Sequence, residues 1–167
     1  MIVAHVGHTT PVPATVWLAA AVLSGLLAAV AMDVPMTRLA TGWTPATVAT
    51  SVLQGTVPSK VSRTEAAVLH HAVGPMAAVL YALVGIGLAA ILPAVARVAG
   101  LEIAAHLLAA GFVTLFVYGL FAWVVLPRYG GEARDRLPAV RRDWLVSALV
   151  FGGTLAVLVP GIVVAVR

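Results

Sequence analysis

The chain has 167 residues, of which 62% are hydrophobic and only 10% charged, and its mean hydropathy is +1.06. Soluble domains are nearer half apolar and a quarter charged, so this composition excludes an ordinary water-soluble domain and predicts one membrane domain, residues 1–167, in a lipid bilayer. The absence of cysteine excludes disulfides and thiolate sites, and the net charge of +4 comes from basic residues between apolar segments, which favours membrane topology over nucleic-acid binding.

Residues 14–33 form the first apolar segment and predict a transmembrane helix. The nineteen residues from Ala14 to Met32 carry no charge, and a helix of that length rises about 28 Å, close to the ~30 Å hydrocarbon core of a bilayer. No Lys or Arg precedes the segment, so it lacks the basic start of a signal peptide and we expect it to be retained. Val34-Pro35 then disfavours continuation of the helix beyond Asp33.

The connection that follows, residues 36–61, contains a short predicted helix. Thr44 and Pro45 suit the N-cap and first position of a helix, and Gly55 suits its end. Residues 45–54 are too few to cross a bilayer. We therefore expect a short interfacial helix between the first two spans.

Ser62 opens the second predicted span with a capping-box pattern, because Glu65 follows three residues later. The apolar run behind this pattern predicts a helix over residues 63–97, with a bend at Pro93 near its end. Gly100 then breaks the chain and leaves a tight connection to the next span.

The third span is predicted over residues 101–127, closed by Pro127, and the fourth over residues 144–166. The charged stretch between them, 128–143, is expected to be exposed to solvent. Four such helices predict an all-α integral membrane protein, a four-transmembrane up-down helix bundle.

The positions of the basic residues predict the orientation of this bundle. The loops 33–65 and 128–143 lie on one side and contain eight of the ten Lys and Arg residues, whereas the other side has Arg97 and Arg167. The positive-inside rule therefore places both loops in the cytoplasm and both termini outside the cell membrane. Nine of the ten basic residues are arginines in an Ala-, Val- and Gly-rich chain, a bias that favours a GC-rich prokaryotic genome.

The arginines of the 128–143 loop form a candidate surface for anionic lipid headgroups or a cytoplasmic partner. They are Arg128, Arg134, Arg136, Arg141 and Arg142. The alternative is that they set the membrane orientation and bind nothing.

One group of polar residues belongs to the cytoplasmic half of the predicted spans and forms the candidate inner site: Asp33, His70, His71 and Tyr81. His70 and Tyr81 fall near one helical stripe, while His71 points about 100° away, so at most one histidine should face the bundle centre. An Asp–His pair at this depth could hold a proton or a metal ion. The alternative is that both histidines lie at the headgroup level and serve no chemistry.

A second group belongs to the outer half. Glu102 and His106 are spaced i, i+4 and share a helix face. Together with His5 and His8 they could bind zinc or copper through N and O ligands. The alternative is an interfacial contact of Glu102 with His106 or with Arg97.

A haem bound by two histidines of one chain is excluded by depth. His71 lies near the inner end of the second span and His106 near the outer end of the third. About twenty residues of helix separate their depths, on the order of 30 Å. The sequence leaves the cofactor, if there is one, unknown.

Enzyme signatures are missing: the chain has no Walker loop, nucleophile elbow, HExxH helix or dinucleotide fingerprint. The leading hypothesis is a non-catalytic accessory or scaffold subunit of a larger membrane complex, bound to a membrane-protein partner or to further copies of itself. The second is a metal- or proton-handling binding or transport protein centred on Asp33, His70 and His71. The third is a membrane enzyme that uses those histidines on a lipid or quinone headgroup.

Overall fold

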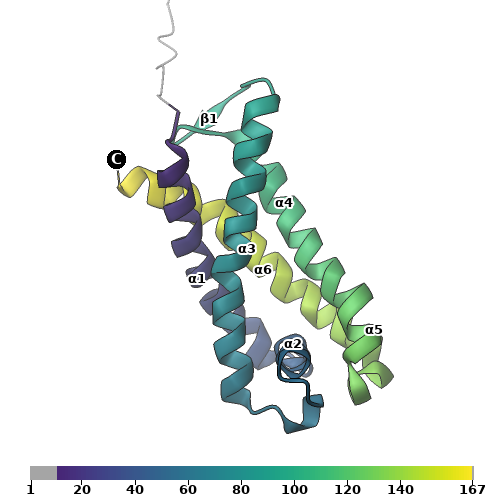
Figure 1. Cartoon of the computed structure of the whole chain (residues 1–167). Helices are drawn as coiled ribbons and strands as arrows, with labels where there is room; N and C mark the ends of the chain where they lie inside the picture. The colour runs from purple at the N-terminus through teal and green to yellow at the C-terminus, as the bar shows by residue number, and fades with distance from the viewer. Residues whose placement is uncertain (1–10, 167) are drawn as a thin grey trace, which may run out of the picture.

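A computed structural model describes residues 11–166 and is almost entirely helical (Figure 1). The all-α class expected from the sequence is confirmed. The helices are α1 (Ala14–Arg38), α2 (Thr44–Gln54), α3 (Arg63–Ile91), α4 (Ile103–Gly119), α5 (Leu126–Tyr129) and α6 (Leu137–Ala165). Shorter elements are the 3₁₀ turns η1 (Pro58–Lys60) and η3 (Gly131–Arg136), the π-helical segment η2 (Leu120–Val125), and the strands β1 (Arg97–Val98) and β2 (Leu101–Glu102).

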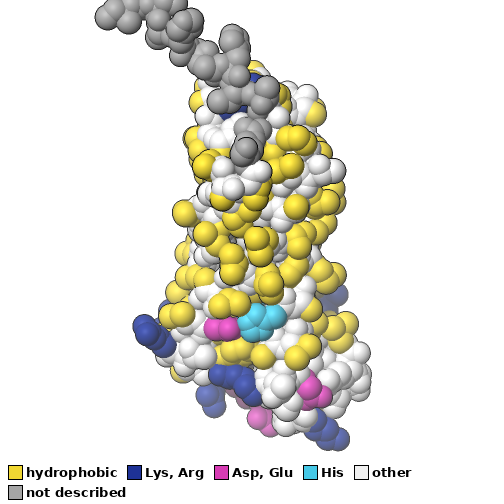
Figure 2. Space-filling model, turned by 90° about the vertical axis from the view of Figure 1, so that its left-hand side faces the viewer, with side chains coloured by type: hydrophobic (Ala, Val, Ile, Leu, Met, Phe, Trp, Pro, Cys, Tyr) yellow, Lys and Arg dark blue, Asp and Glu magenta, His cyan; other side chains and the backbone are white. Residues whose placement is uncertain are grey.

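Four helical stretches within residues 11–166 are long and apolar enough to cross a membrane: Ala14–Arg38, Arg63–Ile91, Ile103–Tyr129 and Gly131–Ala165. Many Leu and Val side chains on their outer faces are exposed, whereas Ser24, Thr114 and Ser147 are buried between them. Figure 2 shows hydrophobic side chains over the middle of one face and charged ones gathered mainly toward the lower end. This distribution is the one expected of helices surrounded by lipid.

The four long helices pack so that each contacts two others. α1 packs against α3 and α6, and α4 packs against the same two helices from the other side. Figure 1 shows that successive long helices run in opposite directions, with α6 crossing behind α3. α2 lies at the lower end of the molecule and packs against α3.

α1 and α3 approach each other closely at two glycines. A Cβ on Gly25 would lie 2.4 Å from the Cβ of Ala78, and a Cβ on Gly74 would lie 2.7 Å from the Cβ of Ala29. Small residues permit this approach of two helix backbones in a membrane. The small-residue face of α1 therefore packs within the chain.

α3 begins and ends for identifiable reasons. The capping box expected at Ser62 forms, because its side chain accepts from the Glu65 N–H and the Glu65 carboxylate accepts from the Ser62 N–H. The prediction that this helix runs to residue 97 is wrong, since it ends at Ile91. Pro93 lacks an N–H and forces the preceding residue, Leu92, into an extended conformation with ψ 145°.

A β-hairpin replaces the predicted end of α3. β1 and β2 pair antiparallel, with Arg97 opposite Glu102. Ala99 (φ 54°) and Gly100 (φ 77°) form the turn, and both have positive φ. A two-residue turn of this kind matches the twist of the strands it joins.

Two other predicted helix ends are also wrong. α1 continues through Pro35 to Arg38. This extension buries Met36, and the N–H of Leu39 donates to the Pro35 carbonyl. The only backbone donor that the helix loses at Pro35 is the N–H that proline lacks, near the last turn. α6 begins at Leu137 rather than residue 144, with Pro138 in its first turn, where the missing N–H is tolerated.

The third span passes Pro127 by changing its helix type. Pro127 has no N–H to donate to the turn before it, and the N–H of Leu126 donates to Phe121, five residues back. The Ala122 carbonyl accepts a hydrogen bond from Arg141 Nε at 3.0 Å instead. The helix therefore runs on as η2 and α5 to Tyr129.

Candidate functional site

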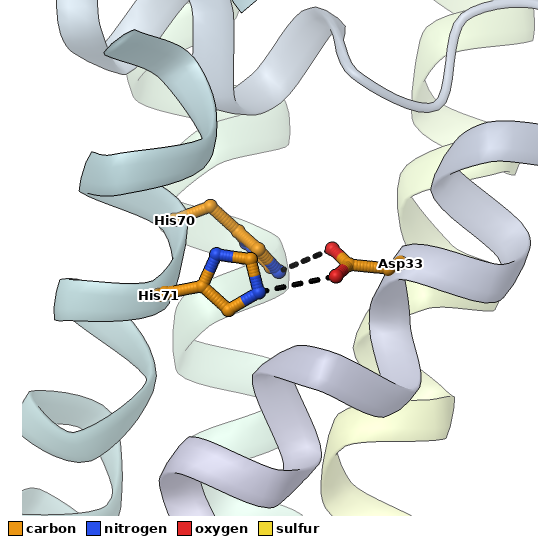
Figure 3. A group of neighbouring side chains, drawn as sticks. All are labelled: Asp33, His70 and His71. Atoms are coloured by element: carbon orange, nitrogen blue, oxygen red, sulfur yellow. Dashed lines mark hydrogen bonds and ion pairs between the residues drawn. The ribbon is translucent and has the colours of Figure 1, made fainter. Parts of the chain in front are cut away.

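Asp33 of α1 and two histidines of α3 meet at one point (Figure 3). Asp33 lies two turns beyond Gly25, and His70 and His71 lie one turn before Gly74. The close approach of α1 and α3 at those glycines brings the three side chains together. They form the one group of three metal-ligating residue types found within residues 11–166, with ligand atoms all within 4.8 Å of one another.

Both histidines face the same carboxylate. His71 Nε2 lies 3.1 Å from Asp33 Oδ2, and His70 Nε2 lies 3.6 Å from Asp33 Oδ1. The burial agrees with the prediction that at most one histidine would face the bundle centre, because His70 is buried and His71 is not. Asp33 lies between the two rings and contacts both (Figure 3).

The site is buried on one side and accessible on the other. The His70 side chain is 8% exposed, while those of His71 and Asp33 are 31% and 33% exposed. The Trp43 ring packs edge-on against the His70 ring at 5.8 Å between centroids. Arg63 lies over the Trp43 ring, 4.0 Å from its centroid. The carboxylate is therefore open to the outside of the bundle on the side of His71.

Backbone carbonyls determine which ring nitrogens carry hydrogen. The Ala67 carbonyl accepts from His71 Nδ1 at 2.8 Å, and the Ala29 carbonyl accepts from His70 Nε2 at 2.9 Å. In a neutral His71, Nε2 then bears a lone pair that faces a carboxylate oxygen 3.1 Å away. Two lone pairs at that distance repel, so a proton or a metal ion must lie between them.

The carboxylate has a second unsatisfied atom. Asp33 Oδ1 is buried and has no hydrogen-bond partner within residues 11–166. Buried acceptors are almost always paired in folded proteins, and an orphan one commonly marks a missing water or ion. Both oxygens of Asp33 therefore face positions that favour a cation.

Tyr81 does not belong to this site. It lies eleven residues beyond His70 on α3, about 16 Å along the helix axis. Trp17 Nε1 donates to the Tyr81 hydroxyl at 3.2 Å, the hydroxyl donates to His106 Nδ1, and His106 Nε2 donates to the Ala156 carbonyl at 3.0 Å. These contacts join all four long helices, and every ring nitrogen and hydroxyl in them is paired. The network is structural.

The predicted outer cluster is not assembled. The Glu102 carboxylate accepts from the backbone N–H groups of Val95, Ala96, Ala104 and Ala105. His106 points away from it toward Tyr81. The first turn of a helix has donors without partners, and Glu102 is the nearest acceptor, so the carboxylate caps α4. His5 and His8 lie outside the described residues.

The five arginines of the basic stretch have different surroundings. Arg128, Arg134, Arg136 and Arg142 are exposed. Arg141 is half-buried, donates to the Ala122 carbonyl and stacks on Trp123 with 3.9 Å to the ring centroid. Its role is thus to hold η2, rather than to present a cation to a headgroup.

Sequence reasoning missed Asp143 by assigning it to an exposed loop. It is only 1% exposed. Its Oδ2 accepts from Thr41 N at 3.1 Å and from Thr41 Oγ1 at 2.7 Å, and its Oδ1 accepts from Arg142. Buried positions 140, 143, 144, 147, 148 and 151 recur at helical spacing. That period could have shown that α6 begins before residue 144.

The chain was compared with protein-family models, curated proteins and solved structures, and none of them matches. A proposal for the function therefore rests on the geometry of Asp33, His70 and His71.

Proposed function

We propose that this chain is a small multi-pass membrane protein that binds a divalent transition-metal ion through Asp33, His70 and His71. The observation that carries the proposal is the Asp33–His71 contact. His71 commits Nδ1 to the Ala67 carbonyl and turns its other nitrogen to a carboxylate oxygen 3.1 Å away. Ionisable groups of this kind within a membrane helix are costly and usually mark a function.

Ligand spacing is compatible with a metal ion. N and O ligands at about 2.0–2.1 Å from a tetrahedral zinc ion lie roughly 3.3 Å from each other. The two His–Asp33 separations, 3.1 and 3.6 Å, bracket that value. A proton between Asp33 and His71 would leave Asp33 Oδ1 without a partner, whereas a metal ion shared with His70 lies within reach of both carboxylate oxygens.

The surroundings of the histidines support the same assignment. Metal-binding histidines usually donate their other ring N–H to a carbonyl or carboxylate, as His71 does to Ala67. His70 must give up its hydrogen bond to Ala29 to bind through Nε2. One carboxylate and two imidazoles suit zinc, copper or cobalt, and leave a position for water or a further ligand.

We further propose an up-down four-helix bundle in the cell membrane, with the 33–65 and 128–143 connections in the cytoplasm. Eight of the ten basic residues in these connections support that orientation. The metal site then lies in the cytoplasmic half. Because the chain has no cysteine, single cysteines at Ser59, Glu132 and Val95 test it with a membrane-impermeant thiol reagent. If the cysteine at position 95 is labelled only by reagent inside the cell, the true orientation is the opposite of the proposed one.

Metal titration of the purified protein in detergent tests the function. All variants carry His5→Ala and His8→Ala, which removes the N-terminal histidines as ligands. Co²⁺ should give the visible absorption of a tetrahedral N/O site, and Zn²⁺ should displace it. Asp33→Asn and His71→Ala should each weaken binding by more than the roughly 10- to 100-fold that loss of an outer hydrogen bond costs.

The matched control is Glu132→Gln, which removes an exposed carboxylate from η3 and should leave binding unchanged. The alternative is that the site holds a proton instead of a metal ion. In that case the unsubstituted protein binds no metal, and Asp33→Asn removes the band of a protonated carboxyl group from the infrared spectrum. Metal binding that survives Asp33→Asn would overturn the proposal.

A subunit role is the second candidate. Gly111, Gly153 and Gly161 lie on α4 and α6, and a Cβ on any of them would meet nothing within 4 Å. Such open glycines permit another helix to approach closely. If the role is correct, Gly153→Leu and Gly161→Leu should release a partner or a second copy that copurifies in mild detergent. A native mass of one chain before any substitution would contradict it.

A further inference from the structure

A cavity of about 340 Å³ lies beside His70, between α3 and α4, with α2 and Trp144 closing it. Small-molecule sites measure roughly 300–1,000 Å³, so this cavity is large enough for one ring with its substituents. Aromatic side chains form much of the wall, namely Phe116, Phe121 and Trp144. His70 has a role in the proposed metal site, but the metal site does not account for the cavity beside it.

Trp144 contributes an unsatisfied donor. The residue is 7% exposed, and its Nε1 is buried with no hydrogen-bond partner in the part of the chain that the structure describes. Trp144 lines the large cavity and also an adjoining one of about 30 Å³. Leaving a buried N–H unpaired costs roughly 1–3 kcal/mol. Once the indole turns its N–H into the cavity, a ligand carbonyl oxygen would recover that cost.

His70 contributes an acceptor to the same cavity. Its Nε2 donates to the Ala29 carbonyl, so in the neutral ring Nδ1 carries a lone pair. An apolar cavity with one N–H donor and one imidazole acceptor suits a flat apolar ring that bears a carbonyl or a hydroxyl group. An acyl chain would leave the aromatic walls without a partner for stacking.

The cavity opens toward lipid. Val73, Met76, Phe116 and Leu120 lie on its wall and are 40%, 68%, 44% and 46% exposed. They belong to the outer faces of α3, α4 and η2, which face the bilayer in the proposed topology. A ligand with a long apolar tail can therefore enter from the membrane and leave its tail between α3 and the lipid.

We propose that this cavity binds the ring of a lipophilic quinone, with a ring carbonyl accepting from Trp144 Nε1 and the tail leaving past Met76. A quinol hydroxyl would donate to His70 Nδ1 in the same position. This site does not require the metal, although both sites share His70. Without metal the His70 Nδ1 accepts from a quinol hydroxyl, whereas with Nε2 on the metal Nδ1 carries hydrogen and donates to a ring carbonyl instead.

Equilibrium binding to the protein in lipid nanodiscs tests the proposal, with empty nanodiscs subtracted. The probe is a radiolabelled benzoquinone with a ten-carbon tail, and the competitor is a methyl ester with the same tail. Trp144→Phe keeps the ring but removes the N–H, and should weaken quinone binding about tenfold. Trp123→Phe changes an exposed indole (61%) on η2 and should have no effect.

A second variant keeps the test valid if Trp144→Phe does not fold. Ala77→Leu fills both cavities from the α3 side and should abolish quinone binding. Asp33→Asn should lose metal and retain quinone binding, so the two proposals fail separately. Equal displacement by the methyl ester would replace the quinone with a lipid ester. Unchanged affinity in both Trp144→Phe and Ala77→Leu would overturn the site.

Discussion

Thr41 gives both its backbone N–H and its hydroxyl to one oxygen of Asp143, across 102 residues of sequence. This contact ties the connection after α1 to the first turns of α6. The other oxygen of Asp143 accepts from Arg142 Nε and from its terminal nitrogen, at 3.2 and 3.0 Å. The lower end of the bundle is therefore closed by one buried carboxylate.

Asp143→Ala should lower the free energy of unfolding by about 2–3 kcal/mol, because it leaves the two Thr41 donors unpaired and removes charged hydrogen bonds. Unfolding in mixed detergent, followed by circular dichroism, measures the change. Asp135→Ala, an exposed carboxylate of η3, is the control and should change it by less than about 0.5 kcal/mol. Equal effects of the two variants would show that Asp143 is not a structural tie.

Gly74→Ala should both destabilise the protein and weaken metal binding. The new Cβ would lie 2.7 Å from the Cβ of Ala29 and from the Gly25 carbonyl, so α1 and α3 must separate. Overpacking of this kind costs about 1–3 kcal/mol. Gly87→Ala on the same helix meets nothing within 4 Å and should stabilise the fold by up to about 1 kcal/mol. Metal titration and unfolding of the pair separate the effect of helix distance from that of helix propensity.

Tyr81→Phe should reduce stability by about 1–3 kcal/mol and leave metal affinity unchanged. Loss of the hydroxyl leaves Trp17 Nε1 and His106 Nδ1 unpaired in the interior. The Tyr81 ring is buried, so the substitution leaves the shape of the core intact. A changed metal affinity would show that the hydrogen-bond network of Trp17, Tyr81 and His106 is coupled to the Asp33 site.

Acid should loosen the start of α4 through Glu102. Burial raises the pKa of this carboxyl, but the hydrogen bonds from Ala105, Val95, Ala96 and Ala104 together hold its pKa below the ordinary 4.5. Because the folded pKa is the lower one, the stabilisation is complete above about pH 4.5 and is lost as pH falls through the folded value. Arg97 lies opposite Glu102 in the hairpin.

Amide hydrogen exchange of Ala104 and Ala105, compared between pH 7 and pH 3, measures this change after correction for the intrinsic rate. Glu102→Gln should show weak protection at both values, since a neutral amide offers one acceptor oxygen in place of two. Protection that is independent of pH in the unsubstituted protein would contradict the role of Glu102 as a charged cap.

Much of the helical architecture could be predicted because its signals are local. Ser62 and Glu65 indicate the start of α3, and Thr44, Pro45 and Gly55 indicate α2. Prolines were less informative. Pro93 ends a helix, but Pro35 and Pro127 do not. α1 continues past Pro35 with the loss of one backbone donor, and near Pro127 Arg141 donates to the Ala122 carbonyl.

The candidate site could be predicted only in part. Depth along the spans indicated that Asp33 and the histidines lie at a similar level. A helical wheel gives the direction of a side chain but not its height, so it grouped Tyr81 with His70 although three turns separate them. Asp143 and Arg141 were assigned to solvent because their partners, 102 and 19 residues away, leave no local pattern.

The 38 residues between Asp33 and His71 also affect how the site is made. At about 5–20 residues per second, the ribosome reaches His71 roughly 2–8 s after it has passed Asp33. During that interval the Asp33 carboxylate has no histidine partner. In the proposed topology α1 therefore enters the membrane with its charged end still hydrated. Asp33 meets His70 and His71 only when α3 packs against α1, so the candidate site is a product of helix assembly rather than of insertion.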